Sequence, residues 1–135
     1  MRYYLDTNII YFALAGTDSL SDDVKDIISD YSNILYTSSV CVMELMQILK
    51  TRPAKGEQQD PQKVFEYLNG MGINVVYVNE KHLTEFSQTP VLHADPNDRL
   101  IIAQAACDRI TLISSDNQFE QYTRYLKTFK FIHNN

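Results

Sequence analysis

Three aspartates stand where predicted helices begin, a position in which an acid can serve either structure or chemistry. Asp6 and Asp116 each follow a short apolar run, Asp6 directly and Asp116 two residues later. Asp98 follows Asp95 and Pro96, which we predict to be the N-cap and the first residue of a helix. Each of the three could simply cap a helix or face its dipole. A carboxylate held on a rigid helix end could also bind a metal ion.

Glu44 is the acid that a purely structural role explains least well. Its neighbours one turn away on a predicted helix are the apolar residues Val40, Cys41 and Ile48. A lone carboxylate on an apolar stripe is destabilising by several kcal/mol unless it is paired or bound to a metal. Two interpretations therefore stay open for this side chain, a buried ion pair with an arginine or lysine and a metal ligand.

A site formed by all four acids would have a definite chemistry. Facing carboxylates repel one another strongly, and a divalent cation would relieve that repulsion. Ligation by oxygen alone favours Mg²⁺ or Mn²⁺, and no cysteine or histidine pair has the spacing of a zinc site. We therefore predict a metal-dependent site for phosphoryl transfer or phosphodiester cleavage, with the acids Asp6, Glu44, Asp98 and Asp116.

The elements that must position these acids alternate along the chain. We predict strands over residues 2–5, 33–37, 73–78, 111–114 and 129–132. Helices are predicted over 7–15, 22–31, 38–50, 64–71, 80–88, 97–109 and 115–126, and a surface loop over 51–63. The strands are continuously apolar rather than alternating, which is typical of a parallel sheet covered on both faces. The pattern predicts a three-layer α/β/α domain with a central parallel sheet.

Such a sheet explains how distant acids could meet. In open α/β sheets, ligands bind beyond the carboxyl ends of the strands. Asp6 and Asp116 are both expected at that edge, because each follows a strand. Glu44 is expected one to two helical turns from the same edge, and Asp98 on a helix beginning there.

Composition sets broader limits. The 135 residues fit one domain, 1–135, and 44% of them are hydrophobic, enough for a substantial core. The formal net charge of −5 argues against a general nucleic-acid binder, which usually has a basic face. The sequence contains no apolar run of membrane-spanning length and no signal peptide, so we expect a cytoplasmic protein. Cys41 and Cys107 are predicted to be reduced core residues.

Four stretches of the chain resemble the motifs of PIN-domain ribonucleases, in that family's order and spacing. They are LDTNII (5–10), SSVCVMEL (38–45), DPNDRLIIAQA (95–105) and LISSDNQF (112–119). The pattern DPxDRxxIAQA is a fairly specific signature, although Asn97 stands where the family often has an aromatic or apolar residue. Within the family the chain is most similar to the VapC-type toxins of toxin–antitoxin pairs.

The resemblance implies an endoribonuclease that depends on Mg²⁺ or Mn²⁺ and cleaves RNA with a metal-activated water, leaving a 5′-phosphate and a 3′-hydroxyl. It also implies a cognate antitoxin protein as partner and a homodimer. It assigns metal binding to Asp6, Glu44, Asp98 and Asp116, and polar supporting roles to Asn8 and Ser114, the latter where the family often has threonine.

Two rival functions stay open on the sequence. A phosphohydrolase with a phospho-aspartate nucleophile needs a second aspartate two residues after Asp6, where Asn8 stands. A non-catalytic RNA- or protein-binding module would use the acids only as helix caps.

The remaining predictions concern residues around the acids. His93 is expected to be a loop histidine without a partner motif, and Arg99 either solvated or paired with a carboxylate or phosphate. Contacts to the RNA backbone are expected from the cations Arg52, Lys55, Lys63, Arg99 or Arg124. Candidates for an apolar floor beneath an antitoxin peptide are Tyr11, Phe12, Met46 and Leu49, each of which core packing would also explain.

Overall fold

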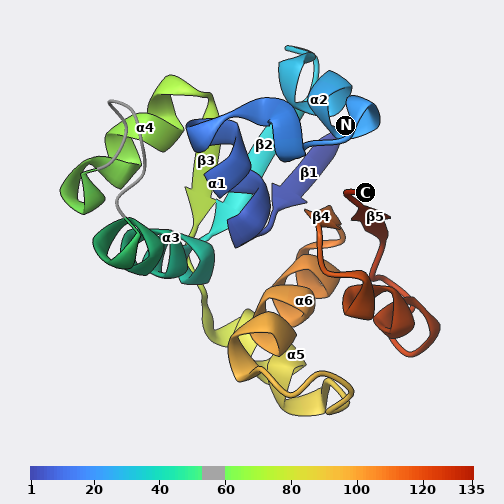
Figure 1. Cartoon of the computed structure of the whole chain (residues 1–135). Helices are drawn as coiled ribbons and strands as arrows, with labels where there is room; N and C mark the ends of the chain where they lie inside the picture. The colour runs from blue at the N-terminus through green and yellow to red at the C-terminus, as the bar shows by residue number, and fades with distance from the viewer. Residues whose placement is uncertain (53–59) are drawn as a thin grey trace.

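The computed structural model describes residues 1–52 and 60–135, and within them five strands form one sheet (Figure 1). The strands lie in the order β3-β2-β1-β4-β5, and every neighbouring pair is parallel. Their bounds are β1 Arg2–Leu5, β2 Ile34–Ser38, β3 Ile73–Val76, β4 Thr111–Ser114 and β5 Phe131–His133. The prediction of a central parallel sheet is therefore confirmed.

Helices occupy the connections between the strands. The α-helices are α1 Thr7–Ala15, α2 Asp22–Ser29, α3 Ser39–Thr51, α4 Val64–Gly70, α5 Glu80–Gln88 and α6 Pro96–Asp108. The described residues also form three 3₁₀ segments, η1 Thr17–Ser19, η2 Pro61–Lys63 and η3 Asn117–Arg124. The predicted surface loop 51–63 falls largely on residues 53–59, which lie outside the described residues.

The direction of the chain across the sheet explains the three layers. Strands β1, β2 and β3 follow one another toward one edge of the sheet. The chain then crosses back and places β4 on the other side of β1. Because parallel crossovers are right-handed, the helices of these two parts cover opposite faces of the sheet. Helix α3 contacts β2 and β3, whereas α6 contacts β4 and has α5 packed along it (Figure 1). The strand order reverses between β1 and β4, which is the point where such folds bind ligands.

The two central strands are anchored in the core. Leu5 of β1 and Leu112 and Ile113 of β4 are almost wholly buried, and Ile9 and Ile10 of α1 pack into the same cluster. Burial of one such side chain stabilises the fold by roughly 1.5–3 kcal/mol. The carboxyl ends of β1 and β4 are therefore held firmly, side by side, by the Leu5–Ile113 register.

A buried polar network ties α5 and α6 to β1. His82 is 1% exposed, and its Nε2 lies 2.9 and 3.0 Å from the two carboxylate oxygens of Asp108. The Tyr4 hydroxyl also donates to Asp108, and Gln104 Nε2 donates to the Tyr4 hydroxyl at 3.3 Å. Burial and the adjacent Asp108 carboxylate raise the pKa of Tyr4. Asp108 is the last residue of α6, and Asp98 lies in the first turn of the same helix. The network therefore holds the helix that carries Asp98.

Some element boundaries differ from the prediction. The segment predicted as helix 115–126 is a 3₁₀ helix, η3, that begins only after Asp116 accepts a hydrogen bond from the Gln118 N–H. The last strand begins at Phe131 rather than at residue 129, because Phe129 turns into the core instead of pairing with β4. Helix α3 is apolar nearly all round, yet its Met43 is 55% exposed.

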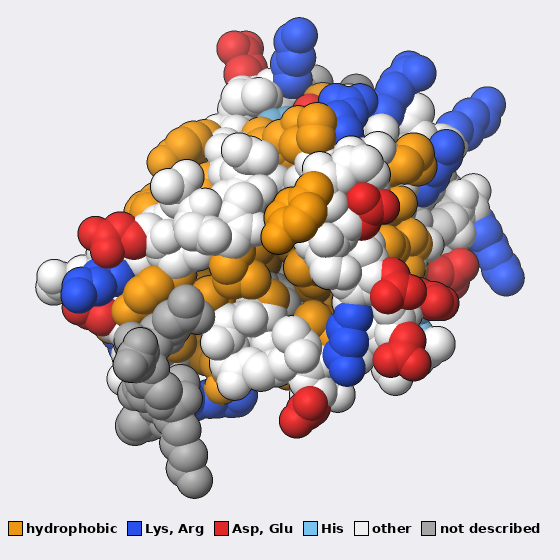
Figure 2. All heavy atoms as spheres, turned by 90° about the horizontal axis from the view of Figure 1, so that it is seen from above, with side chains coloured by type: hydrophobic (Ala, Val, Ile, Leu, Met, Phe, Trp, Pro, Cys, Tyr) orange, Lys and Arg blue, Asp and Glu red, His pale blue; other side chains and the backbone are white. Residues whose placement is uncertain are grey.

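The surface is mixed in character. On the face shown in Figure 2, hydrophobic side chains lie between polar ones, and Lys and Arg side chains gather along one margin. Cys41 is buried, Cys107 is partly exposed, and both are free thiols. Among the described residues, no helix has both the length and the apolar character that crossing a bilayer would require.

Candidate active site

Asp6 is a buried carboxylate held by hydrogen bonds at the end of β1. Its Oδ1 accepts from the Thr7 N–H at 2.8 Å, which makes it the N-cap of α1, and its Oδ2 accepts from the Ser114 hydroxyl at 2.6 Å. Burial raises the pKa of Asp6 to about 6, against the opposing effect of these two bonds, and the nearby carboxylates of Glu44 and Asp116 raise it further. The side chain is thus fixed in position while its charge is disfavoured.

Asp116 follows β4, which pairs with β1, and it therefore lies beside Asp6. Its N–H donates to the Ser114 hydroxyl at 3.0 Å, so that one hydroxyl bonds both to Asp6 and to the backbone of Asp116. Asn8 adds a second tie, because its Oδ1 accepts from the Ser115 N–H at 3.1 Å. Ser114 and Asn8, the two residues expected to support the acids, therefore both connect the start of α1 to the loop after β4.

Asp98 stands in the first turn of α6, as its sequence context predicted. Asp95 is the N-cap, accepting from the Asn97 N–H at 2.9 Å, and Pro96 occupies the first helical position. Burial raises the pKa of Asp98 to about 7; Asp6 and Asp95 raise it further, and His93 opposes the rise. Asp98 is therefore a carboxyl group whose ionisation the metal-free fold resists.

Glu44 completes the group from α3. Its Oε1 accepts from the Thr7 hydroxyl at 2.6 Å. Its carboxylate comes within 4.8 Å of ligand atoms of Asp6 in one cluster and of Asp98 in another. No lysine or arginine of the described residues forms a salt bridge with Glu44, so the buried ion pair that the sequence left open is not found there.

The four acids line one pocket of about 700 Å³ at the carboxyl edge of the sheet. Its lining combines the carboxylates and other polar groups with aromatic and aliphatic side chains of α1 and α3. Apart from the acids, its lining consists of Thr7, Asn8, Tyr11, Phe12, Met43, Gln47, Ile48, Arg52, Asp95 and Asn97. The structure thus brings together all four acids that the sequence predicted, although their roles stay a prediction.

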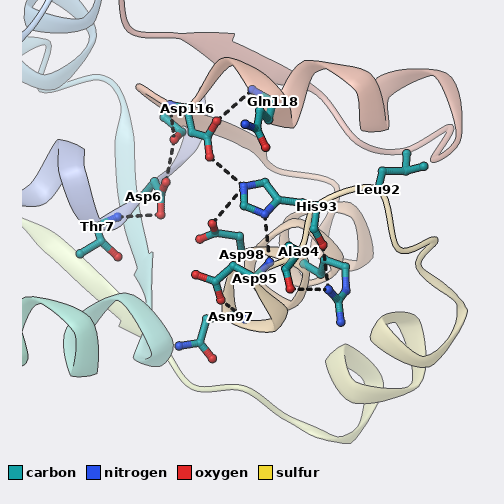
Figure 3. A network of polar contacts seen from close by, with 12 residues as sticks. Asp6, Thr7, Leu92, His93, Ala94, Asp95, Asn97, Asp98, Asp116 and Gln118 are labelled. Carbon is teal, nitrogen blue, oxygen red and sulfur yellow. Dashed lines mark hydrogen bonds and ion pairs between the residues drawn. The ribbon is translucent and has the colours of Figure 1, made fainter.

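His93 lies in a loop, as expected, but it contacts two of the acids, so the expectation that it would lack a partner is wrong. Its Nε2 lies 2.9 Å from Asp116 Oδ2 and 3.2 Å from Asp98 Oδ2 (Figure 3). Asp98 and Asp116 come from different elements, and the loop before α6 places the ring between them. The only sequence signal was the proximity of His93 to the DPxDR motif.

Arg99 is engaged with the backbone rather than with a carboxylate or with solvent alone. Its guanidinium donates to the carbonyl oxygens of His93 at 2.7 Å and Ala94 at 3.1 Å. It also lies over the ring of Phe86, 5.8 Å from the centroid. These contacts hold the loop that precedes α6, so Arg99 is less available for a phosphate than the sequence allowed.

The donor set is chemically suited to a hard divalent cation. Four carboxylates from α3, α6 and the ends of β1 and β4 converge, and oxygen ligands are those that Mg²⁺ and Mn²⁺ prefer. The raised pKa values of Asp6 and Asp98 show the electrostatic strain that a cation would relieve. The four carboxylates therefore fit an Mg²⁺ or Mn²⁺ ion, and His93 lies beside them at the margin of the group.

Comparisons with known proteins agree with this architecture. No curated protein sequence matches the chain. Among solved structures, the chain is similar to one in VapBC2 from Rickettsia felis bound to a promoter DNA fragment, with 19% identity, 100% of both chains covered and a TM-score of 0.73. Chains in VapBC-1 from nontypeable Haemophilus influenzae (19% identity, TM-score 0.66) and DNA-bound VapBC from Salmonella typhimurium (16%, 0.67) are also similar, with 98% of each chain covered. The PIN domain family model matches residues 3–125, and the chain therefore belongs to the PIN-domain family.

Proposed function

We propose that the chain is a metal-dependent endoribonuclease and the toxin of a toxin–antitoxin pair. The observation that carries the proposal is the convergence of Asp6, Glu44, Asp98 and Asp116 on one pocket of a PIN-domain chain. Structures of similar fold include complexes described as toxin–antitoxin systems, which supports the second half of the proposal. Action on cellular RNA would take place in the cytoplasm.

The four acids would hold one or two Mg²⁺ or Mn²⁺ ions between them. When bound, such an ion supplies Lewis-acid activation of a water molecule and stabilises charge on the departing 3′-oxygen. The hydrogen bonds from Ser114 and Thr7 keep Asp6 in one orientation, so this ligand is preorganised before substrate arrives. No side chain of the protein has to act as nucleophile, and the expected products carry a 5′-phosphate and a 3′-hydroxyl.

Arg52 is the cation best placed to meet an RNA phosphate. It lines the acidic pocket, where its guanidinium could form paired hydrogen bonds to phosphate oxygens. Lys63 and Arg124 are exposed but outside the pocket lining, Arg99 is bound to backbone carbonyls, and Lys55 lies outside the described residues. We therefore propose that Arg52, rather than Arg99, makes the main contact with an RNA phosphate.

An antitoxin peptide would bind against the apolar residues that line the pocket. An amphipathic peptide with a basic residue would match an aromatic wall next to a group of carboxylates. Tyr11 and Phe12 line this wall, as expected, with Met43 and Ile48 beside them. Leu49 is only 6% exposed and belongs to the core, which agrees with the core-packing alternative for this residue, so we leave it out of the proposed floor.

A second apolar groove lies next to the active-site pocket. Met46 lines this groove rather than the acidic pocket, together with Met43, Phe65 and Tyr77. Met43, Phe65 and Tyr77 are 55%, 44% and 63% exposed, which is unusual for side chains of this size in one place. A second copy of the chain would cover them, and we propose a homodimer through this groove.

The experiment that tests the proposed activity is cleavage-end mapping of total RNA with the wild type and Asp98→Asn, in Mg²⁺ and in EDTA. We expect discrete ends with 5′-phosphates only for the wild type in Mg²⁺. If both proteins bind RNA but neither cleaves it, the chain is a binding module. Cleavage by the wild type in EDTA would refute the metal requirement, and equal cleavage by Asp98→Asn would refute the site.

A further inference from the structure

The backbone and the ring of His93 are both held by contacts other than those to the acids. Its backbone N–H donates to the hydroxyl of buried Tyr122 at 2.9 Å, and its carbonyl oxygen accepts from Arg99 at 2.7 Å. The ring meets the ring of buried Phe119 edge to face, with centroids 5.7 Å apart and planes at 70°. Because backbone and ring are both constrained, the direction in which Nε2 points is set by the fold.

The tautomer of His93 follows from a third contact. Nδ1 accepts a hydrogen bond from the Asp95 N–H at 3.1 Å, so Nδ1 carries a lone pair and not a proton. In the neutral ring the proton is therefore on Nε2, which faces Asp116 and Asp98 (Figure 3). This N–H donates to Asp116 Oδ2 and lies within ion-pair distance of Asp98 Oδ2.

The carboxylates of Asp116 and Asp98 differ in their other hydrogen-bond partners. Asp116 uses its other oxygen, Oδ1, to accept from the Gln118 N–H at 2.9 Å. Asp98 has no such second partner: among the described residues its side chain accepts no hydrogen bond, and His93 Nε2, 3.2 Å from Oδ2, is its close polar contact, while it shares a cluster with Glu44. Without His93 the Asp98 side chain would lose the contact that orients it.

We propose that His93 is a positioning residue for the metal site: its Nε2–H bonds to Asp116 and contacts Asp98, and so keeps the two carboxylates in the positions from which they would bind a cation. This inference rests on the proposed function, because it presumes that the acids bind a metal. Donors that orient metal-binding carboxylates typically change metal affinity or activity by about 10–100-fold when removed. His93 itself would not bind the metal, since its Nε2 carries the proton that the two acids share.

Two substitutions of His93 distinguish the role of its N–H donor from the role of its ring. His93→Phe keeps a flat ring against Phe119 but has no N–H, whereas His93→Gln places an amide N–H near the position of Nε2. His133→Phe is the matched control, because this histidine bonds to the Ser115 carbonyl and contacts none of the four acids in the part of the chain that the structure describes. Circular dichroism establishes that each variant is folded before metal binding is compared.

The primary readout is the dissociation constant for Mn²⁺, measured without substrate by the electron paramagnetic resonance signal of the free ion. We expect His93→Phe to weaken Mn²⁺ binding by about 10–100-fold, His93→Gln to recover most of that loss, and His133→Phe to bind as the wild type does. The Mg²⁺ concentration for half-maximal RNA cleavage should rise in the same order.

The outcomes separate this inference from the proposed function. Equal Mn²⁺ binding by the wild type and His93→Phe would refute the role of His93 while leaving the nuclease proposal intact. A loss in His93→Phe that His93→Gln does not recover, or that affects Mn²⁺ but not Mg²⁺, would identify His93 as a direct nitrogen ligand and also overturn positioning. A wild type that binds neither metal would overturn both proposals together.

Discussion

Replacing Asp98 with asparagine should stabilise the protein in the absence of metal. Burial and the carboxylates of Asp6, Asp95 and Glu44 raise the pKa of Asp98 from 3.8 to about 7, an effect that His93 partly opposes. An acid whose pKa is higher in the folded state destabilises the fold when ionised. Its penalty is absent below about pH 4, grows as the pH rises, and is complete above about pH 7.

The size of the effect follows from the same pKa. A rise from 3.8 to about 7 corresponds to an upper limit of about 4 kcal/mol in the free energy of unfolding. The side chain is 19% exposed and the other acids can readjust, so we expect Asp98→Asn to recover about 1–2 kcal/mol at pH 7.5. For a chain of this length that is a gain of roughly 3–10 °C in melting temperature.

The assay is thermal unfolding in EDTA at pH 7.5 and pH 4.5, followed by calorimetry or circular dichroism. The gain of Asp98→Asn over the wild type should be present at pH 7.5 and small at pH 4.5. Asp23→Asn is the matched control, because Asp23 is also in the first turn of a helix but is exposed on α2, and its loss should give no gain at either pH. A melting temperature of Asp98→Asn equal to or below that of the wild type at pH 7.5 would refute the reasoning.

Three further predictions test the metal site and the partner. Asp6→Asn and Asp116→Asn should each abolish Mg²⁺-dependent cleavage in a gel assay with labelled RNA while the circular dichroism spectrum is retained; wild-type rates in both would remove these residues from the site. Mg²⁺ at 100 times its Kd should stabilise the wild type by about 2.7 kcal/mol relative to EDTA, and identical melting curves would favour the capping role of the acids. The product of a neighbouring gene should co-purify with the chain and relieve its toxicity; harmless expression of the chain alone, with no such partner, would refute the toxin assignment but not the nuclease.

Much of the fold and the site was predictable because the relevant information is local. The start of α6 follows from Asp95 and Pro96, whose capping chemistry depends only on the next few residues. The apolar runs that became β1 and β4 contain no alternation, which identified a sheet buried on both faces. Given such a sheet, the positions of Asp6 and Asp116 after these strands were enough to place both at one edge.

The tertiary structure alone decided which side chains meet across the site. Sequence spacing could not show that His93 would contact both Asp98 and Asp116, because Asp116 follows a different strand and the loop conformation depends on Tyr122 and Arg99. These are contacts through space, made by residues up to 29 positions from His93 along the chain. For the same reason Glu44 was recognisable as an unusual acid from its apolar neighbours, but its hydrogen bond to Thr7, 37 residues away, was set by the packing of α3 against α1.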